Sequence, residues 1–532
     1  MKHTILFAFF ACLGIVSFAQ NNYVLPSQIT AQSFPAHVEL RWKNYSGFTY
    51  NIYRTTNNGK SYLKIAETDQ AYYLDFIGKT SKNVSVTYLV LPKGQNINKN
   101  IDLSKAKVTV TRHPSTDEDL LDMTQRYTTR YFFDFADPAT GMARERSNDQ
   151  HGNVVTTGGT GFGIMALIAG MERNYFPKEK GLELIQKILS FLEKSERFHG
   201  AWAHWYDADT QKPFSFSKYD DGGDLVETAF LVQGLLTARE YLQTGSEIEK
   251  SISQRITKLW EEVEWNWYTQ GTDSLYWHWS KNYGWKMNHR IKGHDETLIT
   301  YVLAASSPTY PITAKVYESS YKKSPYYYNG KSYYGIKLPL GMEYGGPLFF
   351  THYSFLGLNP KGLKDEKTDY FEQNRNHALI HRAYAIDNPK KHAGYGAHLW
   401  GFTSSDDPKV GYTSHHPGTD AENGTVSPTA AISSIVYTPQ ESMEVLKYLY
   451  YEKGKQLFGK YGFYDAYNPG MVEGQKVVRS YLAIDQGPIA VMIENHRSGL
   501  LWKLFMQNED VRKGLGELGF RSSPLNPPRG GL

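Results

Sequence analysis

The sequence predicts a mainly helical protein in which a small β-sandwich precedes the helices. Residues 22–112 alternate apolar and polar side chains with the period of two that is typical of strands, whereas residues 115–522 show the period of helices. The hydrophobic share is 40% and the net charge only +4, so the composition is globular and gives no reason to expect a nucleic acid partner. No run after residue 19 approaches the roughly 20 apolar residues that span a membrane.

The first nineteen residues have the pattern of a secretory signal peptide. Lys2 and His3 precede an apolar run at 5–16, and Ala19 closes a small-x-small cleavage site. We therefore expect an exported, periplasmic protein. The only cysteine, Cys12, lies inside this segment, so the processed chain would hold no disulfide. Lipid anchoring at Cys12 is the alternative, and the residues before it match a lipidation motif poorly.

The strands of the N-terminal region are short and separated by turns. Alternating runs occur at 37–42, 49–54, 72–76, 86–90 and 107–111, with turn signals at 57–59, 93–95 and 96–98. The pattern resembles a fibronectin type III module, with Trp42 in an early strand and Tyr88 in a late one. The region contains no cluster of acids or histidines, so we expect it to act as a spacer or a support beside the substrate rather than as a catalyst.

Eleven or twelve helices follow. The helical segments are 118–135, 161–173, 181–194, 224–243, 247–264, 295–305, 361–386, 428–437, 440–458, 484–495 and 498–507. No repeat of roughly 30–45 residues recurs, which disfavours a solenoid. Helical pairs can instead close into a ring, an (α/α)6 toroid, whose long loops gather at one end. The tail at 523–532 is rich in Pro and Gly and is predicted to be disordered.

Aromatic residues make up 14% of the chain, and two loops combine them with histidine. The loops are 202–206 and 276–279. Contact with the apolar faces of sugar rings explains their aromatic side chains better than core filling does. We expect His204, Trp205 and Trp279 to contact carbohydrate.

The densest acidic motif opens a helical stretch. Asp220, Asp224 and Glu227 follow one another at i, i+4 and i+7, which is one face if the helix extends that far. Glycosidic cleavage commonly needs two carboxyl groups. The competing interpretation is a capping box formed by Asp224 and Glu227, which does not account for Asp220.

Two more acidic sites precede apolar helices. Glu296 follows Asp295, and Asp485 lies just before the helical run at 489–493. Each could serve only to place a negative charge at a helix N-terminus. Three acids at three helix starts nevertheless suit a toroid, in which such ends can surround a common pocket.

Other kinds of site are less well supported. His377 and His381 lie at i and i+4 but lack a metal-binding motif, so we predict core histidines and no metal site. The chain has no phosphate-binding loop and no nucleophile elbow. The glycine-rich stretch 158–163 opens a helix without a preceding strand unit, which argues against a dinucleotide site.

A family resemblance is carried by motifs at 157–163, 200–206, 220–227, 395–396, 400–406, 461–465 and 481–487. Together they resemble the bacterial glucoamylase-like domain and, more narrowly, glycoside hydrolase family 144, the bacterial β-1,2-glucanases, over about residues 115–522. The resemblance implies an (α/α)6 barrel that hydrolyses β-1,2-glucan and its oligosaccharides with inversion and without a metal or other cofactor. It also implies a pocket lined by five acids: Asp220, Asp224, Glu227, Glu296 and Asp485. The added sandwich resembles members that release sophorose from a chain end.

Inversion requires an acid and a base about 6.5–9.5 Å apart, with a water between them. We assign Glu296 as the proton donor and Asp485 as the base, with Asp220, Asp224 and Glu227 holding sugar hydroxyls. The rival assignment places one catalytic partner within 220–227. The alternative functions are an endo-acting β-1,2-glucanase, a non-catalytic glycan-binding protein, and a lyase or phosphorylase on the same fold.

Overall fold

The computed structural model describes residues 25–43, 47–95, 103–148 and 150–521. The chain forms two compact units, one up to Ser115 and one from Thr116 onward. Three features predicted from the sequence lie outside the described residues: the signal peptide, the turn at 96–98 and the tail at 523–532. None of the helices in the described part is long and apolar enough to cross a membrane.

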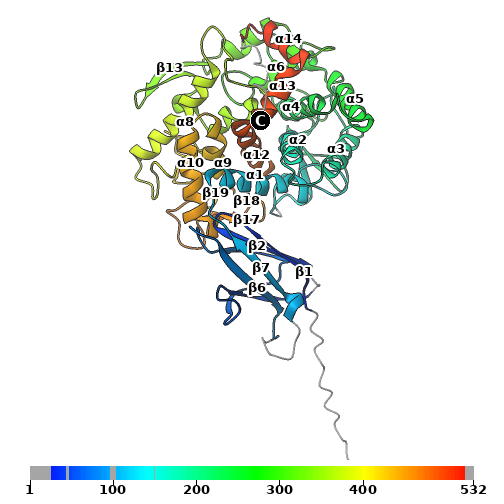
Figure 1. Cartoon of the computed structure of the whole chain (residues 1–532). Helices are drawn as coiled ribbons and strands as arrows, with labels where there is room; N and C mark the ends of the chain where they lie inside the picture. Colours follow the sequence, from blue (N-terminus) through cyan, green and yellow to red (C-terminus); the bar gives the residue numbers. More distant parts are fainter. Residues whose placement is uncertain (1–24, 44–46, 96–102, 149, 522–532) are drawn as a thin grey trace, which may run out of the picture. The chain divides into compact units, whose positions relative to one another are not determined.

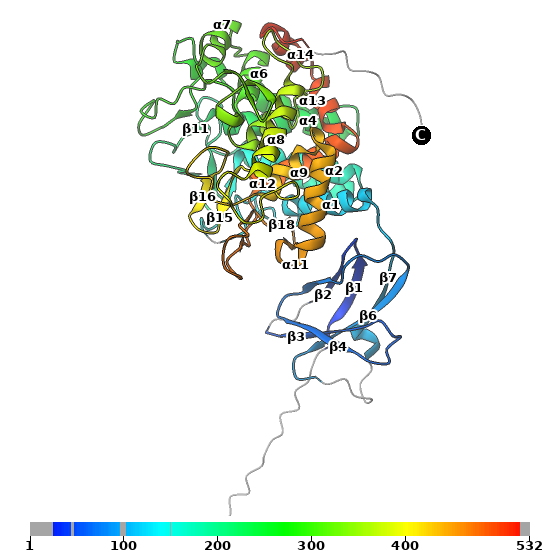
Figure 2. The same ribbon diagram turned by 90° about the vertical axis from the view of Figure 1, so that its left-hand side faces the viewer.

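The N-terminal unit consists of two antiparallel sheets around one core (Figure 2). The first sheet has the order β1 (Ser27–Ser33), β2 (His37–Lys43), β5 (Tyr72–Phe76). The second has the order β4 (Leu63–Thr68), β3 (Tyr50–Thr55), β6 (Val84–Pro92), β7 (Lys107–Arg112), with the short helix η1 (Leu103–Ala106) before β7. Strands β1 and β4 were not predicted from the sequence, because their exposed faces and few apolar residues give a weak alternation.

Side chains from both sheets build this core. Trp42 packs edge-on against Tyr50, with 5.6 Å between the ring centroids. The hydroxyl of Tyr88 donates to the buried Asp75, which also pairs with Arg54 at 2.8 Å. The polar end of the tyrosine is therefore satisfied inside an apolar core, as burial requires.

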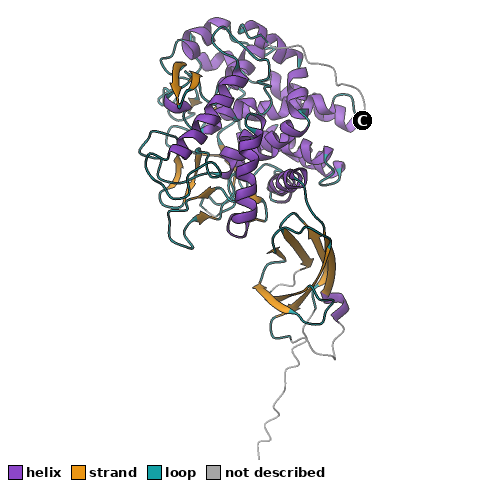
Figure 3. Cartoon of the chain, turned by 60° about the vertical axis from the view of Figure 1, so that its left-hand side comes forward, coloured by secondary structure: helices purple, strands orange, loops and turns teal. Residues whose placement is uncertain are grey.

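The second unit is mainly helical (Figures 1 and 3). Its α-helices are α1 (Asp117–Asp134), α2 (Thr157–Glu172), α3 (Lys178–Leu192), α4 (Leu225–Leu242), α5 (Glu247–Glu261), α6 (Leu298–Ser306), α7 (Ala314–Val316), α8 (Tyr370–Asp387), α9 (Pro428–Ser433), α10 (Pro439–Lys447), α11 (Gly454–Leu457), α12 (Ala483–Arg497), α13 (Leu500–Gln507) and α14 (Glu509–Glu517). The 3₁₀ helices are η2 (Trp265–Thr269), η4 (Glu343–Gly345), η5 (Leu348–Thr351), η6 (Tyr353–Phe355) and η7 (Ser434–Val436), and the π-helical segments are η3 (Tyr317–Lys322) and η8 (Tyr448–Glu452).

Short strands pair within the loops of this unit (Figure 3). They are β8 (Val154–Thr156), β9 (Trp205–Asp207), β10 (Pro213–Phe214), β11 (Gly223–Asp224), β12 (His278–Trp279), β13 (Tyr328–Tyr333), β14 (Ile336–Leu340), β15 (Ser404–Asp407), β16 (Gly411–Ser414), β17 (Phe458–Gly459), β18 (Gly462–Phe463), β19 (Ala466–Tyr467) and β20 (Val477–Val478). Two of these small sheets position the acidic motif: the three-stranded sheet in the order β10, β9, β8, and the pair of β11 with β12.

The helices divide into buried and half-exposed sets. Nearly every residue of α2, α4, α6, α9 and α12 is buried, whereas α3, α5, α10 and α14 bury one face only. The buried helices contact one another in the pairs α2 with α4, α4 with α6, α9 with α12, and α12 with α2. A helix that is apolar all round belongs inside a larger protein, and an amphipathic helix belongs on its outside.

Helices α2 and α4 approach each other through glycines. A Cβ atom at Gly161 would lie 2.2 Å from the carbonyl oxygen of Phe230, and one at Gly234 would lie 2.1 Å from the carbonyl oxygen of Gly161. Neither position has room for a side chain, so the glycine-rich stretch serves helix packing. It also lies within α2, which begins at Thr157 and therefore earlier than predicted.

Other predicted helix boundaries need correction. The helix predicted at 361–386 begins only at Tyr370, because the side chain of Asp369 caps it by accepting from the N–H groups of Phe371 and Glu372. The helix predicted at 440–458 is interrupted by the π-helical segment η8. Helix α14 was not predicted.

Candidate active site

The helical unit contains a cavity of about 400 Å³. Its charged lining consists of Glu145, Arg146, Glu227 and Glu296. The other lining residues are His151, Thr156, His204, Trp205, Phe216, Phe230, Trp277, Phe349, Tyr353, Tyr412, Leu482 and Ile484. Carboxyl groups and aromatic rings face one space, which is the combination that a polyhydroxylated ring substrate needs.

Four of the eight predicted site residues line this cavity: Glu227, Glu296, His204 and Trp205. Asp220 and Asp224 lie directly behind His204, and Asp485 follows the lining residue Ile484. Trp279 is not part of the lining; its ring packs against Trp267, with 5.5 Å between centroids. Sequence reasoning did not find Glu145, Arg146, Tyr353 and Tyr412.

The first acidic motif is arranged differently from the predicted helix face. Helix α4 begins at Leu225, so Asp220 lies outside it, in a turn. Asp224 is the N-cap, and its Oδ1 accepts from the N–H groups of Val226 and Glu227 at 3.0 and 2.8 Å. The competing interpretation, a capping box formed by Asp224 and Glu227, is therefore right about Asp224. Glu227 does not complete the box, because its Oε2 accepts instead from the N–H of Gly158 at 2.7 Å.

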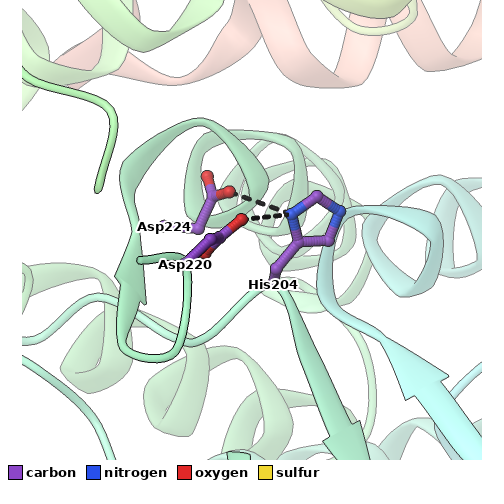
Figure 4. Close-up of side chains that lie close together, drawn as sticks. All are labelled: His204, Asp220 and Asp224. Carbon is purple, nitrogen blue, oxygen red and sulfur yellow. Dashed lines mark hydrogen bonds and ion pairs between the residues drawn. The ribbon is translucent and has the colours of Figure 1, made fainter. Parts of the chain in front are cut away.

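His204 joins Asp220 to Asp224, as Figure 4 shows. Its Nδ1 lies 3.2 Å from Asp220 Oδ2 and 3.1 Å from Asp224 Oδ2. His278, from β12, contacts the same two oxygens with its Nε2 at 3.4 and 3.5 Å. The two aspartates and the two histidines therefore form a ring of alternating charge beneath the cavity.

This ring shifts the protonation of its members. Burial alone lowers the pKa of both histidines, but the neighbouring carboxylates outweigh it, raising the pKa of His278 to about 9 and that of His204 well above its ordinary value. Burial opposes the charge of Asp224, yet hydrogen bonds from both histidines hold its pKa below the usual range. A protonated His204 can thus present a positive edge to the cavity.

We predict that this ring makes stability fall as the pH rises. A group whose folded pKa lies above its unfolded value stabilises the fold fully below the unfolded pKa, here 6.5, and loses that contribution as the pH passes the folded value of about 9. Thermal unfolding measured between about pH 6 and pH 10 should show the decline, and His278→Gln should flatten it. Equal slopes for the two proteins would contradict this account.

The same side chains are the candidate ligands for a cation. One atom each from His204, Asp220 and Asp224 lies within 4.8 Å of the other two. The ion pairs with two histidines already account for this arrangement, so the absence of a metal stays a prediction. His377 and His381, the other pair considered, both contact the carbonyl oxygen of Gly346 through Nε2 at 2.9 Å, as core histidines do.

Glu227 connects the ring to the cavity. Its Oε1 lies 3.7 Å from His204 Nε2. Burial raises the pKa of Glu227 to about 7, with the charge of His204 opposing the shift and that of Asp224 adding to it. A Cβ at Gly158 would lie 2.5 Å from Glu227 Oε2, so only glycine permits the close backbone approach that holds this carboxylate.

Glu296 lies on the loop before α6. Helix α6 begins at Leu298, and Asp295, not Glu296, accepts from the N–H of Thr297, at 2.9 Å. Burial and the negative charge of Asp295 raise the pKa of Glu296 well above its ordinary value. Glu296 therefore retains its proton in a cavity that it lines, which is the condition for a general acid.

Asp485 lies in the first turn of α12, at the helix start that the sequence predicted. The side chain is 3% exposed. Burial and the neighbouring Asp465 raise its pKa well above the ordinary value. The carbonyl oxygen of Asp485 accepts from Thr429 Oγ1 at 2.7 Å, which fixes this turn to α9.

A mainly helical unit with carboxyls and aromatic rings around one cavity has the arrangement expected of a glycoside hydrolase. The family model Glycoamylase, described as "Putative glucoamylase", matches residues 288–509. An exo β-1,2-glucooligosaccharide sophorohydrolase (non-reducing end) from Parabacteroides distasonis is 40% identical over 513 residues, which is 92% of this chain and 70% of the relative. The chain belongs to this family of bacterial β-1,2-glucanases with a glucoamylase-like domain.

Two solved structures are similar in fold and sequence. A β-1,2-glucanase from Parabacteroides distasonis superimposes with a TM-score of 0.84 at 39% identity, covering 94% of this chain and 73% of that one. An endo-β-1,2-glucanase from Chitinophaga pinensis, in complex with sophorotriose and glucose, has a TM-score of 0.74 at 49% identity and covers 77% of this chain and 99% of its own.

Proposed function

We propose that the protein is an exo-acting, inverting hydrolase of β-1,2-glucan and its oligosaccharides that releases sophorose from non-reducing ends. The observation that carries this proposal is the cavity that Glu227 and Glu296 line together with aromatic rings, in a chain of this family. The exo mode is supported by the Parabacteroides distasonis relative, whose similarity extends over 92% of the chain and thus includes the N-terminal unit.

The chemistry divides between two acids. Glu296 donates its proton to the departing glycosidic oxygen, and Asp485 receives the proton of the attacking water. Asp220, Asp224 and Glu227, with His204, orient the sugar hydroxyls. Trp205 offers its ring to the sugar. The assignment of Glu296 is supported by its place in the lining and by its retained proton.

Three structural expectations belong to the same proposal. The helices form an (α/α)6 toroid, supported by the alternation of buried and half-exposed helices. The N-terminal unit is a fibronectin-III-like sandwich, supported by its two sheets and the places of Trp42 and Tyr88. The signal pattern at 1–19 directs the protein to the periplasm, where it would meet exported glucan.

The product profile tests the function. Incubation with long linear β-1,2-glucan should release sophorose from the first minutes, without added phosphate. A ladder of mixed oligosaccharides would instead establish the endo mode, which the 49% identity to the Chitinophaga pinensis enzyme favours as the second candidate. No release of reducing ends would leave a glycan-binding protein, dependence on phosphate would indicate a phosphorylase, and unsaturated products would indicate a lyase.

We predict that the first-formed product is the α-anomer. An inverting enzyme places a water between two separated carboxyls, so attack occurs on the face opposite the β-linkage. Proton NMR or polarimetry in the opening minutes, before mutarotation, should show the α signal first. An initial β-anomer would require a covalent intermediate and would remove Asp485 from the role of base.

A further inference from the structure

A second buried carboxyl lies beside Asp485. Asp465 is 4% exposed and follows β18, in a motif that the family resemblance included but to which no role was assigned. The Nε2 of Gln486 donates to the carbonyl oxygen of Phe463 at 3.0 Å, which holds the segment of Asp465 against the first turn of α12. The side chains of Asp465 and Asp485 lie close enough for each carboxyl group to shift the pKa of the other.

One carboxyl oxygen of each residue lacks an external donor. Asp465 Oδ1 and Asp485 Oδ2 are both buried, and no other donor group among the described residues reaches either of them. Two carboxyls in contact cannot both ionise readily, and one proton held between them satisfies both oxygens. The geometry is therefore that of a pair with one proton and one negative charge.

The surroundings place the charge on Asp465. Its Oδ2 accepts from the backbone N–H of Asp406 at 2.6 Å, a bond that favours the ionised form. Asp406 pairs with Arg146 at 3.0 Å, which brings a guanidinium to the same side. Burial and the charge of Asp406 still raise the pKa of Asp465 to about 7, so the charge is that of a competent base near neutral pH.

Other groups also face the pair. Glu145 is paired with Arg146 at 2.6 Å, and the charge of Asp485 acts on the hydroxyls of Tyr353 and Tyr412. None of these is a cation that contacts Asp485 directly. The ionised form of Asp485 is thus less well supported than that of Asp465.

We propose that Asp465 is a positioning residue that acts through Asp485. In the hydrolytic step Asp485 takes the proton of water, and Asp465 is the final proton acceptor. The proposal rests on the proposed function. An O–H bond of water breaks as its oxygen bonds to the anomeric carbon, and that proton passes to Asp485. The proton that Asp485 held passes to Asp465, and Glu296 gives its own proton to the departing oxygen. One proton is lost by Glu296 and one is gained by the pair.

The variant Asp465→Asn tests this relay, since it preserves size and can still accept from Asp406. We expect kcat to fall by about 10²-fold or more while KM changes by no more than a few-fold. The acidic limb of the kcat/KM profile should move, because the single negative charge of the pair must now reside on Asp485 instead of on Asp465.

Asp137→Asn is the matched control, since Asp137 is buried, accepts from a backbone N–H and does not line the cavity. Its acidic limb should stay in place. If Asp465→Asn behaves like this control, Asp465 has only a structural role. If the wild-type protein releases no sophorose, the proposed function and the relay are both wrong. If the wild type and Asp465→Asn are equally active, only the relay is wrong.

A measurement on the wild type keeps the relay testable if the variant does not fold. β-Sophorosyl fluoride needs no acid, so its hydrolysis isolates the protons on the water side. Turnover in mixtures of H₂O and D₂O should depend on the deuterium fraction along a curve, since two protons move together. A straight line would mean that Asp485 accepts one proton alone and would overturn the proposal.

Discussion

Glu296→Gln should reduce turnover on β-1,2-glucan by about 10²–10⁴-fold, the range for losing general acid–base assistance. The amide keeps the size of the side chain but has no proton of suitable acidity for the leaving oxygen. Glu296 is half-buried and keeps its proton through burial and the charge of Asp295, so the change to glutamine removes this proton from the lining. Initial rates of sophorose release at saturating glucan provide the measurement.

A substrate with a good leaving group separates this role from others. β-Sophorosyl fluoride departs without protonation, so Glu296→Gln should hydrolyse it at a rate close to that of the wild type. Glu249→Gln is the matched control, because Glu249 is a buried glutamate that does not line the cavity. Near-full activity of Glu296→Gln on glucan would transfer the acid role to the cluster at 220–227.

Asp485→Asn should cause a loss of the same order, about 10²–10⁴-fold, on both glucan and the fluoride. The attacking water then has no carboxylate through which to lose its proton, whatever the leaving group. The failure of the fluoride to restore activity distinguishes this variant from Glu296→Gln.

Azide offers a positive test of the same assignment. It is an anion that attacks without giving up a proton, so it should restore turnover of the fluoride by Asp485→Asn and yield the inverted sugar azide. Retention of near-full activity by Asp485→Asn without azide would contradict the role of Asp485 and point to a base elsewhere in the lining, such as Glu145.

Local pattern predicted most of the helices, either from an apolar stripe, as in α3 and α5, or from a continuous apolar run, as in α6. It failed where tertiary contacts decide the outcome. The glycine-rich stretch placed the helix start at 161, whereas α2 begins at Thr157, because α4 packs so closely against Gly161 that no side chain fits there.

The candidate site was predictable to a similar degree. Acids at helix starts identified Glu227 and Glu296, since helix ends can gather around a pocket. Glu145 and Arg146 lie in the loop between α1 and β8, in an alternation of charges that also describes ordinary surface loops. Tyr353 and Tyr412 come from segments far apart in the sequence and meet at the cavity only in the folded chain. The local sequence around each of them therefore does not predict its place in the lining.

The glycine contact between α2 and α4 has a consequence for how this protein can change. Gly158 and Glu227 lie on these two helices and are joined across the same seam by a hydrogen bond of 2.7 Å. Even a methyl group at Gly161 or Gly234 would push the two helices apart. Although neither glycine lines the cavity, the change would loosen the hydrogen bond between Gly158 and Glu227. Because Glu227 and Phe230 of α4 line the cavity, moving the two helices apart would displace part of the lining, whereas the loops can vary in length and sequence without moving the helices.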